Sequence, residues 1–273
     1  MKFDKILAMD LIRSTKKRRS IILELLHAVF NIAFAAAILG LILWFPNNIP
    51  WIASLLVLLS KWRIFTVRFR HWWANILSNL PDLLLGIGIV ILMWQAGAMV
   101  ANSLPVQIAL TIFYAIWLVY LKPQYKKHFV MIQSGLSQFI AISALFVIGY
   151  LLPVWVVIIL TFIIGFASAR QVLGLFQEKD KALLSMIWGL IVAQLSFVAW
   201  HWTIAYQIAL GLKIPAFAII ISLIGFSSAT AYKSYKKHTF IRAKDVKLPI
   251  TFSVIAILII IFLFSGLWDA TAI

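Results

Sequence analysis

The sequence predicts an all-α, polytopic integral membrane protein with nine transmembrane helices, its N-terminus in the cytoplasm and its C-terminus outside. Hydrophobic residues make up 64% of the 273 residues, and the mean hydropathy is +1.03, whereas soluble domains are nearer half apolar. Several apolar runs reach or approach the ~20 residues that a membrane helix needs. The runs are continuous rather than alternating, which argues against a β-barrel.

The basic residues support both the number of spans and their orientation. With the N-terminus inside, all but Lys213 of the 24 Lys and Arg residues lie in segments expected on the cytoplasmic side. The positive-inside rule describes this asymmetry, and omitting any one of spans two to eight would place basic loops on both sides. The net charge of +16 therefore reflects topology and contact with anionic lipid headgroups, not nucleic-acid binding. We expect residence in a cytoplasmic (plasma) membrane.

Residues 1–20 are expected to form a basic cytoplasmic tail, either amphipathic on the membrane surface or frayed, before a single transmembrane domain over 21–273. The first apolar run is too long for a signal-peptide core and has no clean small-residue cleavage site, which indicates an uncleaved anchor. Six of the eight prolines stand where a span is expected to begin, a position that tolerates the missing N–H. The nine spans are expected at about 21–45, 50–65, 81–98, 105–121, 129–151, 153–169, 183–202, 215–232 and 249–267.

Residues 61–80 are expected to form an interfacial helix that overlaps the end of the second span. Aromatic and apolar residues recur there at three- and four-residue steps, and the basic residues lie largely off that stripe, which is typical of a helix lying in anionic headgroups. The residues expected to contact anionic lipid are Lys61, Arg63, Arg68 and Arg70.

The first span contains the best candidate for an intramembrane polar site. Glu24, His27 and Asn31 are spaced so that they share one helix face. A carboxylate in hydrocarbon needs a partner or a proton, so these residues suit a proton-relay, ion or headgroup site open to the cytoplasm. Alternatively, Glu24 reaches the interface near a basic residue, while His27 and Asn31 join hydrogen bonds between helices.

Polar and small residues on other spans are weaker candidates for a substrate pathway. Ser134 and Gln138 belong to a small-polar stripe on the fifth span, and Gln194 adjoins a four-residue repeat of Ser185, Gly189 and Ala193 on the seventh. Stripes of this kind usually allow close helix packing. Asp82, which follows Pro81, is expected in the first turn of a helix, where a negative charge complements the helix dipole.

The sequence gives no sign of a cofactor, a metal site or a catalytic residue set. There is no cysteine, no nucleotide-binding glycine loop, no H-E-x-x-H and no G-x-S-x-G. The protein therefore looks less like an enzyme than like a transporter or flippase for a lipid-linked or weakly polar solute. An accessory or scaffold subunit, with a protein partner or as a homo-oligomer, is one alternative, and a membrane-embedded lipid-modifying enzyme is the other.

Overall fold

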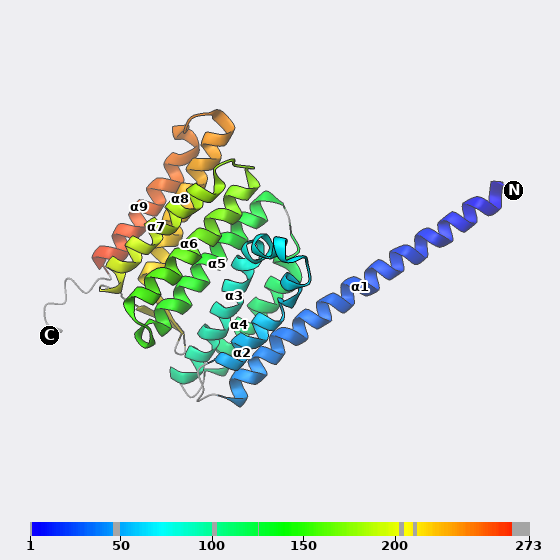
Figure 1. Ribbon diagram of the computed structural model, residues 1–273, viewed down its shortest axis with the longest axis horizontal. Coiled ribbons are helices and arrows are strands. Elements are labelled where there is room, and N and C mark those ends of the chain that lie inside the picture. The colour runs from blue at the N-terminus through cyan, green and yellow to red at the C-terminus, as the bar shows by residue number, and fades with distance from the viewer. Residues whose placement is uncertain are drawn as a thin grey trace.

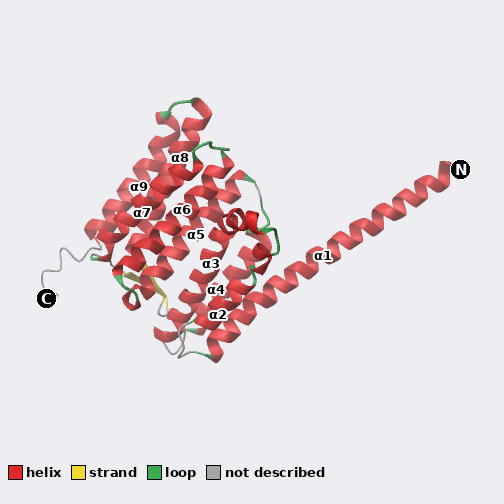
Figure 2. Cartoon of the chain, in the orientation of Figure 1, coloured by secondary structure: helices red, strands yellow, loops and turns green. Residues whose placement is uncertain are grey.

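A computed structural model describes residues 2–45, 50–99, 103–124, 126–201, 205–209 and 212–263, with only the backbone given before residue 22 and at a few later positions. Within these ranges the chain is almost entirely helical (Figures 1 and 2). The α-helices are α1 (Lys2–Trp44), α2 (Trp51–Leu59), α3 (Trp72–Met99), α4 (Leu104–Ile116), α5 (Lys127–Ile148), α6 (Val154–Leu175), α7 (Lys181–Trp200), α8 (Ala216–His238) and α9 (Ala243–Leu263). Short elements are η1 (Trp62–Phe65), η2 (Phe69–His71), the π-helical turn η3 (Trp117–Leu121), η4 (Gly149–Leu151), β1 (Ala205–Ala209) and β2 (Leu212–Pro215).

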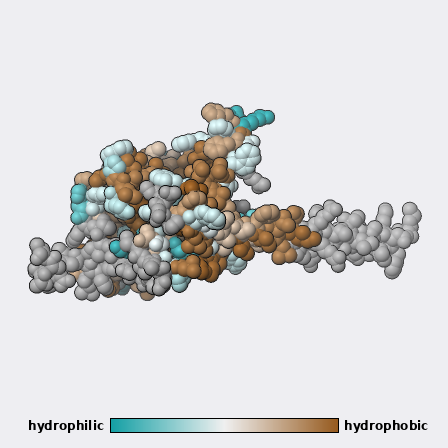
Figure 3. Space-filling view, turned by 90° about the horizontal axis from the view of Figure 1, so that it is seen from below, coloured by the Kyte–Doolittle hydropathy of each residue, from teal (hydrophilic) through white to brown (hydrophobic). Residues whose placement is uncertain are grey.

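Eight of the described helices are long and apolar enough to cross a membrane. The chain is therefore a multi-pass integral membrane protein, and exposed apolar side chains cover much of its described surface (Figure 3). The helix that contains the first expected span begins at Lys2, and its N-terminal part projects beyond the bundle (Figure 1). Where a second full span is expected, α2 has only nine residues, far fewer than the ~20 that cross a bilayer.

The segment 61–80 differs from the expected interfacial helix. It is divided into η1, η2 and the start of α3, because its aromatic rings pack on one another and turn the chain. The Trp72 ring lies 5.1 Å from the Phe65 ring and 4.8 Å from the Phe69 ring. Its indole Nε1 also donates a hydrogen bond to the carbonyl of Val67 at 2.9 Å. The chain can therefore reverse between α2 and α3.

The prolines separate into helix starts and helix interiors. Pro50, Pro153 and Pro215 are N-caps, in keeping with the sequence pattern. Pro81 and Pro249 instead lie inside α3 and α9, because polar or charged turns before them also join the helix. An interior proline leaves the carbonyl four residues earlier without its helical donor and disturbs the helix axis.

Five of the segments that carry basic residues gather at one end of the bundle. Figure 1 shows η1, η2, the loop after η3, the α6–α7 loop and the α8–α9 turn at that end. In the α6–α7 loop, hydrogen bonds from Lys236 and Tyr232 hold the pKa of Glu178 below its ordinary range. Strands β1 and β2 pair in antiparallel fashion at the opposite end.

Two hydrophobic cores share helix α5. The first joins α1, α2, α3, α4 and η3, and the second joins α5 with α6, α7 and α8. Ile140 and Ala144 belong to the first core, whereas Ala141, Ile142 and Leu145 belong to the second. Opposite faces of one helix therefore support the two halves of the bundle.

Helices α6 and α7 approach closely through small residues. A Cβ atom added to Gly189 would lie 2.9 Å from the carbonyl oxygen of Phe162, and one added to Gly165 would lie 3.2 Å from the Cα of Gly189. Ser185 and Ala193, on the same stripe of α7, are buried. The small-residue repeat of the seventh span thus serves helix packing, as small residues do in membrane bundles.

We expect Gly189→Ala to destabilise the protein by about 1–3 kcal/mol, because the added methyl group meets backbone, which cannot move aside as a side chain can. Gly135→Ala on α5 is the matched control, since a Cβ atom added there would have no neighbouring atom within 4 Å. Denaturant titration in detergent micelles measures both variants. Equal stabilities of the two would contradict the close α6–α7 contact.

Candidate functional site

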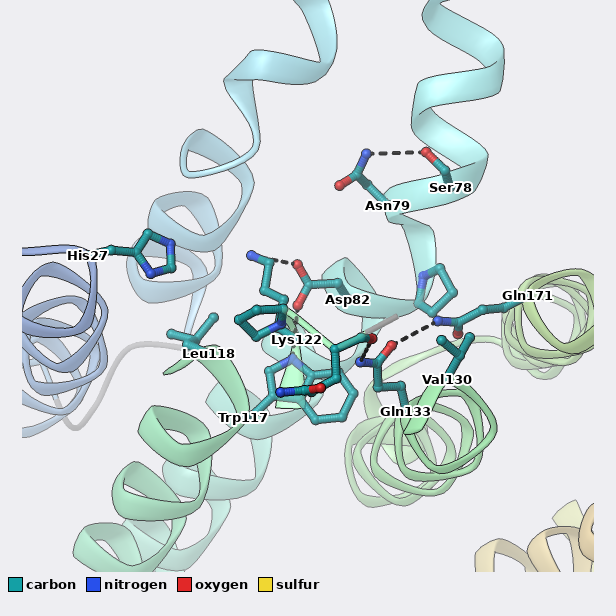
Figure 4. Close-up of a pocket in the computed structure, with 13 residues that line it drawn as sticks. His27, Ser78, Asn79, Asp82, Trp117, Leu118, Lys122, Val130, Gln133 and Gln171 are labelled. Atoms are coloured by element: carbon teal, nitrogen blue, oxygen red, sulfur yellow. Dashed lines mark hydrogen bonds and ion pairs between the residues drawn. The ribbon is translucent and has the colours of Figure 1, made fainter. Parts of the chain in front are cut away.

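A polar cavity of about 420 Å³ opens at the basic end of the bundle, between α1, α3, η3, α5 and α6. Figure 4 shows side chains from these elements converging on it. Its walls combine charged and amide groups with Leu118, Val130 and the rings of Pro81 and Trp117. The cavity therefore suits a ligand that is polar at one end.

Two irregular helix segments form the cavity wall. In α3, Pro81 interrupts the regular hydrogen bonding, and its own carbonyl accepts a hydrogen bond from Ser137 of α5. Beyond α4, the π-helical turn η3 places Trp117 and Leu118 at the cavity, and the Lys122 N–H bonds the Trp117 carbonyl at 2.8 Å. Pro123 then ends the helix. Such irregularities within membrane helices are frequent at functional sites.

An ion cluster centred on Asp82 forms the charged part of the wall. Asp82 Oδ2 accepts from Lys61, which follows α2, and lies 3.0 Å from Lys122 Nζ (Figure 4). Asp82 Oδ1 accepts a hydrogen bond from Trp117 Nε1 at 2.9 Å. The exposed fractions of the side chains are 9% for Lys61, 15% for Asp82 and 40% for Lys122. Lys61 is thus the buried partner, and Lys122 is the one open to the cavity.

Amide groups form the opposite part of the wall. Gln133 Nε2 donates to the carbonyls of Leu121 and Gln124, the second at 3.1 Å. Gln171 Nε2 lies 3.4 Å from Gln133 Oε1. The buried Gln171 Oε1 has no hydrogen-bond partner among the described residues. These bonds fix the loop after η3 against α5.

The structure places His27 at the cavity but not all of the polar residues predicted with it on the first span. His27 lies in the cavity wall. Asn31 Nδ2 lies 3.1 Å and 3.2 Å from the two ring nitrogens of His27 and donates a hydrogen bond to the His27 carbonyl at 2.9 Å. The two residues therefore do share a helix face. Glu24 is exposed and is not among the residues that line the cavity.

The weaker pathway candidates lie away from the cavity. Ser134 Oγ donates to the carbonyl of Ser168 at 2.7 Å. Gln138 Oε1 accepts from Ser168 and from Trp188 Nε1, the latter at 3.3 Å. These buried bonds join α5 to α6 and α7, while Gln194 is exposed on α7.

Among the residues expected to contact lipid, Lys61 is the exception. It is turned inward to Asp82, whereas Arg68 and Arg70 are exposed. The side chain of Arg63 lies outside the described set. Within the described residues, no group of three His, Cys, Asp or Glu side chains is arranged to hold a metal ion.

Asp82 is the central residue of the ion cluster, but from the sequence alone it is expected to complement a helix dipole. Its expected place in a first helical turn is wrong, because α3 begins at Trp72. Asp82 therefore lies well inside α3 and forms ion pairs rather than complementing the helix dipole. The sequence does contain a signal for this ion pair. Asp82 stands beside one apolar run, and Lys61 stands at the end of the preceding apolar run.

These features define a class: a helical, multi-pass membrane protein with a charged and amide-lined cavity at one end of its bundle. Comparison with known proteins adds no relative, since no family model, curated protein or solved structure matches the chain.

We expect Asp82→Asn to destabilise the protein by about 3–5 kcal/mol, because it leaves the buried ammonium of Lys61 without its counter-charge. The double variant Lys61→Met, Asp82→Asn should recover most of this loss, since it also removes the buried cation. Asp245→Asn is the control: the contact of Asp245 with His238 Nε2 is more exposed, such surface pairs contribute about 0–1 kcal/mol, and an asparagine there can still accept the hydrogen bond from Ser234 Oγ. Thermal unfolding in detergent measures all three. A double variant no more stable than Asp82→Asn alone would contradict the pairing.

Proposed function

We propose that the protein is a transporter or flippase that receives a lipid-linked or weakly polar solute in the cavity beside Asp82. The observation that carries the proposal is the coincidence of this cavity with two irregular helix segments, Pro81 in α3 and the turn η3. Transporters commonly form their binding sites from interrupted membrane helices, because interrupted backbone can line a cavity and can change shape.

The same proposal includes the orientation of the protein in the membrane. Five of the segments with basic residues lie at the cavity's end of the bundle, and the positive-inside rule assigns such an end to the cytoplasm. The cavity then opens toward the cytoplasmic leaflet of a plasma membrane, and strands β1 and β2 lie on the outer side. A solute enters from the cytoplasmic leaflet or from the cytoplasm itself.

The surface around the cavity favours an amphiphilic solute. His27 stands in the cavity wall, and its neighbours Leu23, Leu26 and Phe30 are exposed at 66%, 52% and 67%. An apolar chain can remain in the bilayer along α1 while its polar end occupies the cavity. A ligand without an apolar part gains nothing from this arrangement.

The proposal predicts that filling the cavity stops transport. Val130→Trp adds a large ring at a buried residue of the cavity wall and should reduce the protein-dependent redistribution of fluorescent lipid about tenfold or more. Ile132→Trp, two residues along α5 and exposed at 47%, should leave it unchanged. The assay reconstitutes the full chain in vesicles with a headgroup panel of labelled phospholipids and glycolipids and follows dithionite quenching. Redistribution no faster than in protein-free vesicles for every probe would reject the proposal.

A further inference from the structure

The charges around the cavity leave one cation without a matching anion. Asp82 is the only carboxylate among the described residues that line it, whereas Lys122 and the adjoining Lys61 supply two ammonium groups. Lys61 is buried against Asp82 and satisfies that carboxylate. Lys122 is the more exposed partner and carries the excess charge into the cavity (Figure 4). The site is therefore electrostatically matched to an anion.

Lys122 can exchange its partner without exposing a bare charge. When an anion takes Lys122, Asp82 keeps the bond from Lys61 and the 2.9 Å bond from Trp117 Nε1. A buried carboxylate that retains a cation and a hydrogen bond avoids most of the penalty of an unpaired charge. Asp82 therefore holds Lys122 until an anionic ligand competes for it.

The amide groups of the other wall are already bonded within the protein. Gln133 Nε2 donates to the carbonyls of Leu121 and Gln124, and Gln171 Nε2 lies 3.4 Å from Gln133 Oε1. Lys122 is therefore the group of the wall that an anion can contact. A lysine ammonium is a common phosphate binder, and the volume of about 420 Å³ lies within the range of small-molecule sites.

We propose that the cavity binds a phosphate ester, with the phosphate on Lys122. This inference rests on the proposed function, because it names the class of solute that the carrier receives. The exposed apolar residues of α1 beside His27 favour a lipid as the source of the phosphate ester, with its acyl chains outside the cavity.

Binding to the purified full chain in detergent tests the inference separately from transport. Titration calorimetry compares dihexanoyl phosphatidylglycerol, which has the phosphate ester, with dihexanoylglycerol, which lacks it, and with free glycerol 3-phosphate. Lys122→Gln should weaken binding of the short-chain phospholipid about tenfold or more, the loss expected for a charge-assisted hydrogen bond. Lys126→Gln is the matched control, since this exposed lysine of the same loop does not line the cavity.

Two further variants test the separate parts of the site. In the Lys61→Met, Asp82→Asn double variant, Lys122 has no competing carboxylate, and affinity for the phospholipid should rise several-fold. Lys122→Arg keeps the positive charge and changes the shape of the side chain. Retained binding by this variant would show that the charge is what the phosphate requires, in support of the inference.

The outcomes are distinguishable. Equal affinity for dihexanoylglycerol and the phospholipid, or equal effects of Lys122→Gln and Lys126→Gln, would overturn the inference while leaving transport open. Phospholipid binding that depends on Lys122, without redistribution in vesicles, would uphold the phosphate site and reject the carrier. Glycerol 3-phosphate that binds as tightly as the short-chain lipid would uphold the phosphate ester and identify its source as soluble.

Discussion

The ion cluster of Lys61, Asp82 and Lys122 is the interaction on which the cavity depends. It joins the end of α2, the interior of α3 and the end of η3, so three separate segments meet at one carboxylate. In a low-dielectric environment such a carboxylate persists only with partners, and each partner must be held in place. The short α2 and the aromatic turn at Trp72 are what bring Lys61 back to α3.

The need to surround this carboxylate with partners also explains where the helices depart from regular α-helical geometry. A straight α3 with Pro81 at its start would put Asp82 at a helix end, in contact with water. Because α3 begins at Trp72, Asp82 lies inside the helix instead, and Ser137 donates to the proline's carbonyl. At η3 the π turn brings the Trp117 indole to the second carboxylate oxygen. Both irregularities thus serve one charged group.

The sequence is sufficient for the parts of the fold that follow local rules. Apolar runs predict the long helices, because each run must bury its backbone bonds within itself in lipid. The length of α2 and the interior place of Pro81 are not predictable in this way, because contacts between segments decide them. For the site, the structure places His27 in the cavity wall, and Asp82 is misassigned by the sequence analysis. Its partners come from other segments, which no spacing rule connects.

The division of α5 between two cores has a mechanical consequence. Ile140 and Ile142 are two residues apart, yet each belongs to a different core, so the helix is the common axis of two packed bodies. The glycine contact makes α6 and α7 a stiff pair on one side, and α1, α2 and α4 pack with α3 on the other. Cores resist internal rearrangement more than sliding at their boundary. Relative movement of the two cores would therefore turn about α5, and the cavity, whose wall includes η3 from the first core and α6 from the second, lies between them.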